Sequence, residues 1–227
     1  MLKAHPGIIM IICAVLLTAC GGGSSSASLP FVENFDDEET CLNRDVASFG
    51  VLEIENGEFI IGVNAVNQLV WATCEEIVLD NFTFEMDFYD ETNGEGFRFI
   101  GLQFRKGPVD GGSNQYYLVR FGMGGDASPA SCVGMASDNS WIDDITKSPD
   151  GDSCWVDLPM PIQPNEWNHV EITANGSEIT YKVNNVLVAS VDDSRLTEGL
   201  IALFAGTHDV DNARFKIDNI RITAPTD

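Results

Sequence analysis

Basic residues are scarce in this chain, whose 227 residues include 12 Lys and Arg against 35 Asp and Glu, for a formal net charge of −23. A protein that binds nucleic acid or an anionic membrane surface needs a basic face to contact phosphates. The charge balance therefore argues against both as partners. We expect most of the acidic side chains to keep the protein soluble and a few of them to bind a cation.

The chain also has no apolar run long enough for a membrane span. The stretch 8–17 is shorter than the about 20 residues that a spanning helix needs, and it follows Lys3, as the core of a secretory signal follows a positive start. The next phrase, Leu17–Cys20, resembles the lipobox of bacterial lipoproteins. In that family a peptidase cleaves before the cysteine, and the cysteine sulfur carries lipid.

The lipobox resemblance implies a signal peptide over residues 1–19, a lipidated Cys20 with a flexible Gly/Ser tether over 20–28, and a single domain over 29–227. Gly21 is a residue that generally permits export to the outer membrane in Gram-negative lipoproteins. We therefore expect a lipid-anchored protein of the bacterial cell envelope, at the outer membrane or cell surface. The alternative is an ordinary signal peptide in which the cysteine is incidental.

Cysteine pairs with C-x-x-C spacing are absent, which argues against a zinc site or a redox motif. Four cysteines remain beyond the tether, and an even number in an exported chain indicates disulfides. Three pairings are possible. We predict the sequential one, because it closes the shortest loops: Cys41–Cys74 and Cys132–Cys154.

Helical periodicity is missing after the signal segment, where apolar and polar residues alternate instead. Period-two patterns predict strands with one face in the core, and phrases such as Asn175-Gly176 mark tight turns between them. In the closing strand the alternation slips by one residue at Asp218-Asn219, which predicts a bend. The pattern favours an all-β fold, a two-sheet antiparallel β-sandwich. The expected strands are 82–89, 97–105, 115–121, 170–173, 179–183, 186–191, 199–204 and 213–223.

The segment 122–164 breaks this rhythm, being rich in Gly, Ser, Asp and Pro. We predict a long loop insertion there, closed by one disulfide. Trp141 and Trp155 lie in it among polar neighbours, and exposed indole rings stack on sugars, so both are candidate ligand-binding residues. The alternative is that they fill their own loop. Trp71 and Trp167 adjoin apolar strand residues and are expected in the core or at strand edges.

Three phrases resemble concanavalin A-like sandwiches. Residues 166–172 and the turns after them resemble the hairpins of those folds, 215–222 resembles their closing strand, and 101–105 resembles an inner strand. Together they suggest the laminin-G-like group and the 3-keto-disaccharide hydrolase-like domains related to family 16 glycosidases. The resemblance implies a concanavalin A-like jelly roll over about 31–223, with a polysaccharide or oligosaccharide bound on the concave sheet or at the loop rim.

Family 16 glucanases carry their catalytic carboxylates on one strand, spaced E-x-D-x-E or E-x-D-x-x-E. The matching strand here has Glu85 and Asp87 on one face, but its third position is Tyr89 or, with a bulge, Asp90. Glu85, Asp87 and Asp90 are therefore weak catalytic candidates, and an acidic solvent-facing strand is the alternative. The N-S-G phrase of the 3-keto-disaccharide hydrolases is absent, so no catalytic residue is carried over from that family.

Calcium is the one cofactor that the resemblance implies. Many carbohydrate-binding sandwiches tie the first strand to the last with a structural calcium, and carboxylate oxygens suit that hard cation. Asp36, near the start, and Asp218, in the closing strand, are the expected ligands; solvated carboxylates are the alternative.

These observations predict a lipid-anchored, non-catalytic, glycan-binding β-sandwich that meets the membrane only through its lipid. Two other functions stay open. One is a glycoside hydrolase of the family 16 or 3-keto-disaccharide type, and the other is a structural or adhesive envelope lipoprotein. Two carboxylates facing each other across a cleft would distinguish the enzyme from the binder.

Overall fold

The computed structural model describes residues 29–37, 39–46, 48–93, 95–109, 112–125, 129–138, 140–148, 150–158, 162–163 and 165–226. The predictions for 1–19 and 20–28, including lipidation of Cys20, lie outside these ranges. The described residues form fifteen strands, and none of them belongs to a helix long and apolar enough to cross a membrane.

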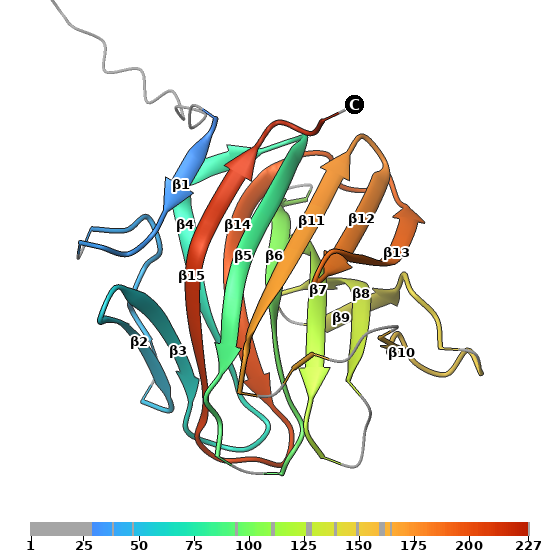
Figure 1. The fold of residues 1–227 in the computed structure, drawn as a ribbon. Helices are drawn as coiled ribbons and strands as arrows, with labels where there is room; N and C mark the ends of the chain where they lie inside the picture. Colours follow the sequence, from blue (N-terminus) through green and yellow to red (C-terminus); the bar gives the residue numbers. More distant parts are fainter. Residues whose placement is uncertain are drawn as a thin grey trace, which may run out of the picture.

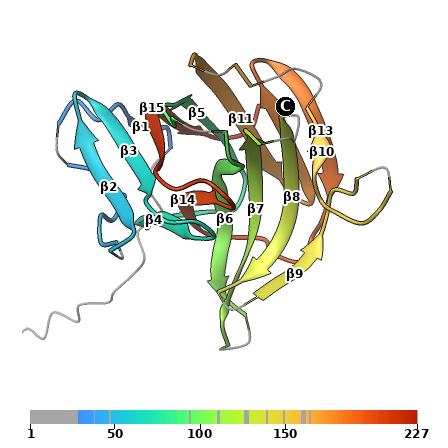
Figure 2. The same cartoon turned by 90° about the horizontal axis from the view of Figure 1, so that it is seen from below.

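The strands form two antiparallel sheets, which confirms the predicted sandwich; sheet A lies in front of sheet B in Figure 1. Sheet A runs in the order β13 (Val186–Asp192), β12 (Glu178–Val183), β11 (Trp167–Asn175), β5 (Phe82–Asp90), β15 (Ala213–Thr223), β3 (Glu58–Val63) and β2 (Gly50–Glu55), with β1 (Phe31–Glu33) paired to β15. Sheet B runs in the order β10 (Val156–Asp157), β8 (Ala130–Ser137), β7 (Asn114–Met123), β6 (Arg98–Pro108), β14 (Gly199–Thr207) and β4 (Leu69–Leu79), with β9 (Ser140–Asp144) beside β8. Figure 2 shows the two layers from below.

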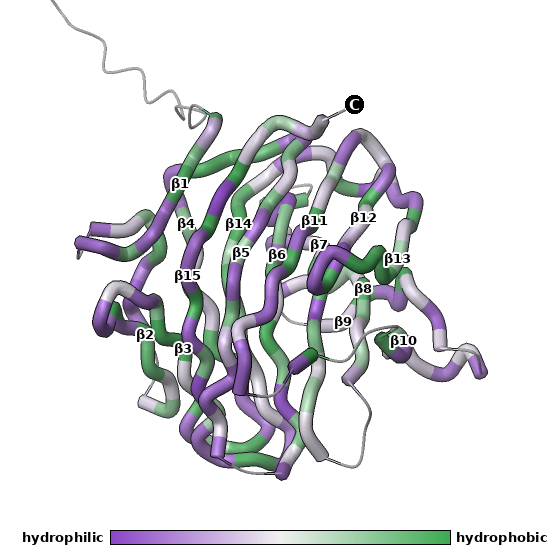
Figure 3. The backbone as a smooth tube through the Cα atoms, in the orientation of Figure 1, coloured by the Kyte–Doolittle hydropathy of each residue, from purple (hydrophilic) through white to green (hydrophobic). Residues whose placement is uncertain are grey.

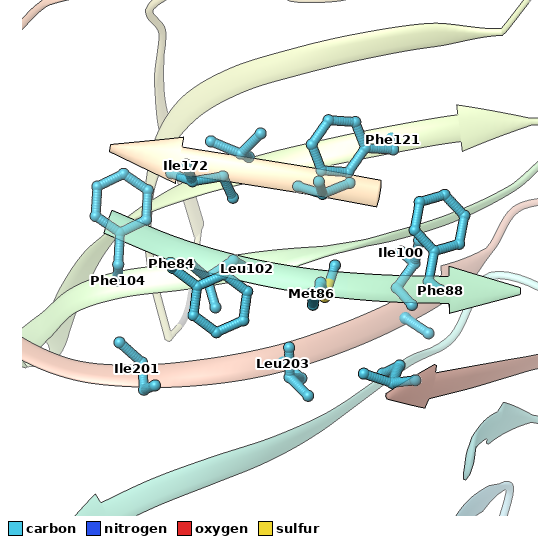
Figure 4. Packing of buried hydrophobic residues seen from close by; sticks show 14 of the residues in the cluster. Phe84, Met86, Phe88, Ile100, Leu102, Phe104, Phe121, Ile172, Ile201 and Leu203 are labelled. Atoms are coloured by element: carbon cyan, nitrogen blue, oxygen red, sulfur yellow. The ribbon is translucent and has the colours of Figure 1, made fainter. Parts of the chain in front are cut away.

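The core lies between the sheets and follows from the alternation of apolar residues along each strand. In β5, Phe82, Phe84, Met86 and Phe88 are fully buried, while the residues between them are partly exposed. Figure 4 shows Phe84, Met86 and Phe88 among inward residues of sheet B. The Phe82 and Phe104 rings meet edge to face at 5.7 Å. Each such burial stabilises the fold by about 1.5–3 kcal/mol.

Sheet B is apolar on its outer face as well. In β6 the residues from Arg98 to Arg105 are all buried, so the strict alternation of β5 is lost. The residues that point away from the core form a second, smaller apolar cluster: Phe99, Leu118, Ala136 and Phe204, with Phe97, Tyr116 and Trp155 packed against them. The tube of Figure 3 shows how hydropathy changes along these strands. The outer face of sheet B therefore carries an apolar surface that could bind a ligand.

The predicted bend in the last strand is confirmed. The pairing of β15 with β5 shifts between Asp218 and Arg221, and Asn219 has a positive φ of 54° there. An extra residue in one strand of an antiparallel pair produces such a bulge, which changes the phase of the side chains that follow.

The segment 122–164 was predicted as a loop, and this prediction is wrong, because the segment contains β8, β9 and β10. Small residues in β8 serve packing here rather than turns. A Cβ on Gly134 would lie 2.3 Å from the Trp141 ring, and the Ser131 hydroxyl lies 2.7 Å from the Tyr181 hydroxyl. Both predicted disulfides, Cys41–Cys74 and Cys132–Cys154, are formed.

Candidate functional site

A groove of about 650 Å³ crosses the outer face of sheet B. The second apolar cluster forms its floor, and its rim is polar. Strands β4, β14, β6, β7, β8 and β9 and the turns beside them contribute the lining residues, which are Asn67, Gln68, Leu69, Trp71, Phe99, Gln103, Lys106, Asn114, Tyr116, Leu118, Arg120, Ala136, Ser137, Asp138, Ser140, Trp141, Phe204 and Thr207.

One row of residues crosses the groove from strand to strand. Trp71 on β4 pairs with Phe204 on β14, Phe204 with Gly101 on β6, Gly101 with Arg120 on β7, and Arg120 with Cys132 on β8. Neighbouring strands lie about 4.8 Å apart, so Trp71 and Arg120 are separated by about 14 Å across the sheet. The row therefore places an indole near one edge of sheet B and a guanidinium towards the other.

Glycines within the strands make room for this arrangement. A Cβ on Gly101 would approach the Phe204 ring to 2.9 Å and the Val119 carbonyl oxygen to 2.1 Å. A Cβ on Gly206 would come within 2.3 Å of the Phe99 ring. The aromatic rings thus pack closely against backbone that carries no side chain, and close approach of another group is a known use of glycine in a strand interior.

Two tryptophans in the groove are exposed. Trp71 is 49% accessible and Trp141 is 41% accessible, and both line the groove. The Trp141 indole nitrogen donates to Asp144 at 2.8 Å, which holds the ring in place. Of the two expected places for Trp71, the core and a strand edge, the structure shows the second: its strand is the edge strand of sheet B, and the side chain lines the groove.

Trp155 plays a different part from Trp141. It does not line the groove, and its ring packs edge to face on Phe97 at 5.2 Å, with Phe99 at 6.2 Å. Trp155 therefore belongs to the apolar cluster under the groove.

Arg120 lies between the two rings. Its guanidinium is 4.5 Å from the Trp141 ring centre and 4.7 Å from that of Trp155. One terminal nitrogen contacts the sulfurs of the Cys132–Cys154 disulfide, at 3.1 and 3.3 Å. Burial lowers the pKa of Arg120 to about 10, against the opposing charge of Asp144. Nothing in the sequence pattern singled out this residue.

The weak catalytic candidates lie on the other layer. Glu85 and Asp87 do share one face of β5, but this is the outer face of sheet A, away from the groove. Asp87 lies 2.8 Å from Nδ1 of His169 and accepts from the Asn219 amide at 2.9 Å, and Glu85 lies 3.8 Å from Nε2 of His169.

Asp90 does not share the outer face of the strand with Glu85 and Asp87. The strand keeps its alternation to the end, so Asp90 faces inward, where it is 4% exposed and accepts bonds from Nε and Nη2 of Arg98. The bulge that would have turned it outward lies in β15 instead. Asp90 is a structural partner of Arg98.

Asp218, one of the two residues predicted to bind calcium, lies among acidic side chains. Burial raises the pKa of Asp218, and the charges of Asp87, Glu58 and Asp36 raise it further. Within the described ranges, however, no three His, Cys, Asp or Glu side chains are grouped so that they could hold a metal ion. Calcium stays a prediction.

The fold and the groove define a concanavalin A-like jelly roll of the kind found in carbohydrate-binding modules and glucanases. The family model for 3-keto-alpha-glucoside-1,2-lyase-like domains matches residues 32–223, and the chain belongs to this family. No curated protein matches the chain in sequence.

Solved structures with the same fold include a carbohydrate-binding module, CBM66 from Bacillus subtilis, with a TM-score of 0.50, 19% identity and coverage of 72% of this chain and 86% of that one. The Bacillus licheniformis β-glucanase has a TM-score of 0.54 and 14% identity, covering 86% and 98%. The laminarinase catalytic domain from Thermotoga maritima has a TM-score of 0.59 and 14% identity, covering 87% and 98%. At these identities the likeness shows the fold alone.

Proposed function

We propose that this protein is a lipid-anchored glycan-binding module of the cell envelope, which binds an oligosaccharide or polysaccharide in the groove of sheet B. The observation that carries the proposal is the pair of exposed indoles, Trp71 and Trp141, that line one apolar-floored groove. Indole rings stack on the apolar faces of sugars, and a polar rim supplies hydrogen bonds to the hydroxyls. The structures that share this fold include a carbohydrate-binding module and enzymes named for β-glucans.

The composition of the groove favours binding over cleavage. Glycoside hydrolysis of the usual kind needs a pair of carboxylates flanking the bond. Among the described residues that line the groove, Asp138 carries the one carboxylate, and it accepts a hydrogen bond from Asn114 at 2.8 Å. A sugar bound over the tryptophans would therefore meet no opposing pair of acids.

A glycan-cleaving enzyme is the second candidate, and the cluster of Glu85, Asp87 and His169 favours it. The His169 ring lies between the two carboxylates, and histidine and carboxylate side chains are the usual general acids and bases of enzymes. Glu85 also lines a second depression, on the outer face of sheet A, with Glu171 and Lys182. This candidate requires the glycan to bind on the face opposite the tryptophans.

One experiment separates these functions. The purified protein is applied to a glycan array, and hits are repeated with Trp71→Ala, Trp141→Ala, Glu85→Gln and the matched surface control Trp167→Ala. A binding module in the groove loses affinity in the first two variants and releases no product. Product release that disappears in Glu85→Gln would establish the enzyme instead, and no binding with no product would support a structural role.

Anchoring is a separate part of the proposal and rests on Leu17–Cys20 with the apolar run before it. Two acyl chains or more are needed for stable attachment, which is what lipoprotein processing supplies. Cells that express the protein should incorporate labelled palmitate into the wild type and not into Cys20→Ala. Equal labelling of both would contradict the anchor and leave the groove proposal untouched.

A further inference from the structure

We propose that the groove selects anionic glycans, those that carry carboxylates or sulfate esters, and that Arg120 is the residue that recognises the anion. This inference rests on the proposed function, since it names the class of sugar that the same groove binds. It begins from the contrast between the charge of the groove and that of the chain.

The chain has nearly three acidic residues for each basic one, with 35 against 12. The described lining of the groove reverses this ratio, because it includes Arg120 and Lys106 but Asp138 as its one carboxylate. Asp144 lies close to Arg120, outside the lining, and its carboxylate is engaged by the Trp141 indole. A groove with this lining in so acidic a protein points to a ligand of negative charge.

Several basic side chains elsewhere on the described surface are paired with carboxylates, whereas the buried Arg105 donates to the backbone carbonyls of Asp80 and Leu196. Arg195 contacts Asp143 and Asp193, Arg214 contacts Glu53, Glu55 and Glu91, and Lys216 contacts Glu58 and Glu91. Arg120 has ring and sulfur contacts instead and forms no ion pair with a described carboxylate, although most of its surface is removed from water. Burying a cation without an anion is costly, so a ligand anion that supplied the missing charge would gain in affinity.

The atoms left without partners agree with this assignment. Nε of Arg120 and Oε1 of Gln103 are buried and have no hydrogen-bond partner among the described residues. Gln103 is 7% exposed and lines the same groove, on the neighbouring strand β6. An acidic sugar offers an anion for the guanidinium and a hydroxyl donor for the amide oxygen, whereas a neutral sugar offers only the second.

Lys106 is the second basic residue that lines the groove, and its position bears on the size of the ligand. Lys106 lies over the Tyr116 ring at 5.6 Å, and Tyr116 is four residues from Arg120 on β7, which is about 13 Å along an extended strand. Two cations at different positions along the groove suit an oligosaccharide with repeated acidic groups. A single acidic monosaccharide would reach only one of them.

The test compares anionic and neutral forms of the same backbone, measured by calorimetry with the purified full-length protein. One arm uses oligogalacturonate and its methyl ester, and the other uses dextran sulfate and dextran, so the arms distinguish carboxylate from sulfate. We expect the anionic member of at least one pair to bind about ten-fold or more tightly than the neutral one. This preference should shrink as salt is raised, because charge attraction at an open groove is screened.

Variants then locate the effect. Arg120→Gln and Lys106→Gln should reduce the anionic-to-neutral affinity ratio, Arg120→Lys should restore part of it, and Arg221→Gln, on the outer face of sheet A, should leave it unchanged. Arg120 also packs on a disulfide, so a purely structural role would lower the melting temperature of Arg120→Gln with the ratio intact, and this result would overturn the inference. Lys106→Gln keeps the test open if Arg120→Gln does not fold.

The two levels of the proposal fail in different ways. Equal binding of the charged and neutral members of both pairs, lost in Trp71→Ala, would overturn the anionic preference and leave the glycan-binding groove in place. Binding of neither pair, together with no hit on a glycan array, would contradict both. Anionic binding that is unchanged in Arg120→Gln and Lys106→Gln would remove these residues from the site.

Discussion

Gly101 and Arg120 face each other across strands β6 and β7, so the one long cationic side chain of the row stands opposite a residue with no side chain at all. The guanidinium can therefore lie flat against the sheet between two tryptophan rings rather than extend into solvent. On the other side of Gly101, Phe204 fills the space and continues the row to Trp71. The shape of the groove floor depends on a glycine, Gly101, between two residues with large side chains, Phe204 and Arg120.

Substituting Gly134 tests that dependence. A Cβ there would lie 2.3 Å from the exposed Trp141 ring, so Gly134→Ala should displace the ring and weaken glycan binding. Gly107→Ala in β6 is the control, because its Cβ would meet nothing within 4 Å. Titration calorimetry and melting curves on both variants check this. Unchanged affinity in Gly134→Ala would mean that the Trp141 ring position does not matter for binding.

Asp90 should prove structural. Asp90→Ala would leave the Arg98 guanidinium buried without its anion, and we expect a loss of about 3–5 kcal/mol in the free energy of unfolding. Glu85→Gln and Asp87→Asn, on the solvent side of the same strand, should each lower it by much less. Urea unfolding of the three variants measures the difference. A stable Asp90→Ala protein that had lost a glycan-cleaving activity would restore Asp90 as a catalytic residue.

Acid should weaken the contact between β7 and the turn before β14. Tyr117 donates to Asp193 at 2.5 Å and accepts from the Leu196 amide at 3.0 Å. Burial works to raise the pKa of Asp193, but hydrogen bonds from Arg195 and Tyr117 outweigh it and lower the pKa to about 2. Because the folded pKa lies below the ordinary value of about 3.9, this carboxylate stabilises the fold above that value and the contribution is lost as pH falls towards 2.

Comparison of wild type with Asp193→Asn isolates that contribution. The variant should unfold at lower urea than the wild type at pH 7, and the difference should close near pH 2. Tyr117→Phe should cost about 1–3 kcal/mol at pH 7, since it leaves the Leu196 amide without its acceptor and removes one of the donors to the Asp193 carboxylate. A difference for Asp193→Asn that stays constant from pH 7 to 2 would contradict the lowered pKa.

Asp218 offers a test of calcium in which two effects have opposite signs. Burial and the nearby acids raise its folded pKa, so the charged side chain opposes folding at neutral pH, and stability falls as pH rises through the carboxyl range. In chelator, Asp218→Asn should therefore melt higher than the wild type. If calcium binds there, the order should reverse when calcium is added, because binding to the native state stabilises only the wild type. A wild-type melting temperature that does not change when calcium is added would contradict the prediction of a calcium site.

The sequence alone predicts the strands between 82 and 121 and between 170 and 223 and the two disulfides, but not β1–β4 or β8–β10. Alternation in 82–89 predicts β5 within one residue of its observed bounds, and the slip at Asp218-Asn219 predicts the bulge of β15. Sequential cysteine pairing also holds, because Cys132 and Cys154 lie on β8 and in the turn before its neighbour β10. These features are local, so the order of residues along the chain contains the information that decides them.

The residues that form the groove are brought together by pairing between strands that are distant in the sequence, and this pairing could not be predicted from the sequence. Period-two alternation assigns residues to two faces but cannot say which face is covered when both are apolar, and β6 and β7 are apolar on both. For that reason the pattern does not distinguish a core position from a strand-edge position for Trp71, and it does not single out Arg120. Glycines inside strands, such as Gly101 and Gly134, were the available signal, since they mark close approach of another group. Only the register of β4, β14, β6 and β7 places Trp71, Phe204, Gly101 and Arg120 in one row across the sheet.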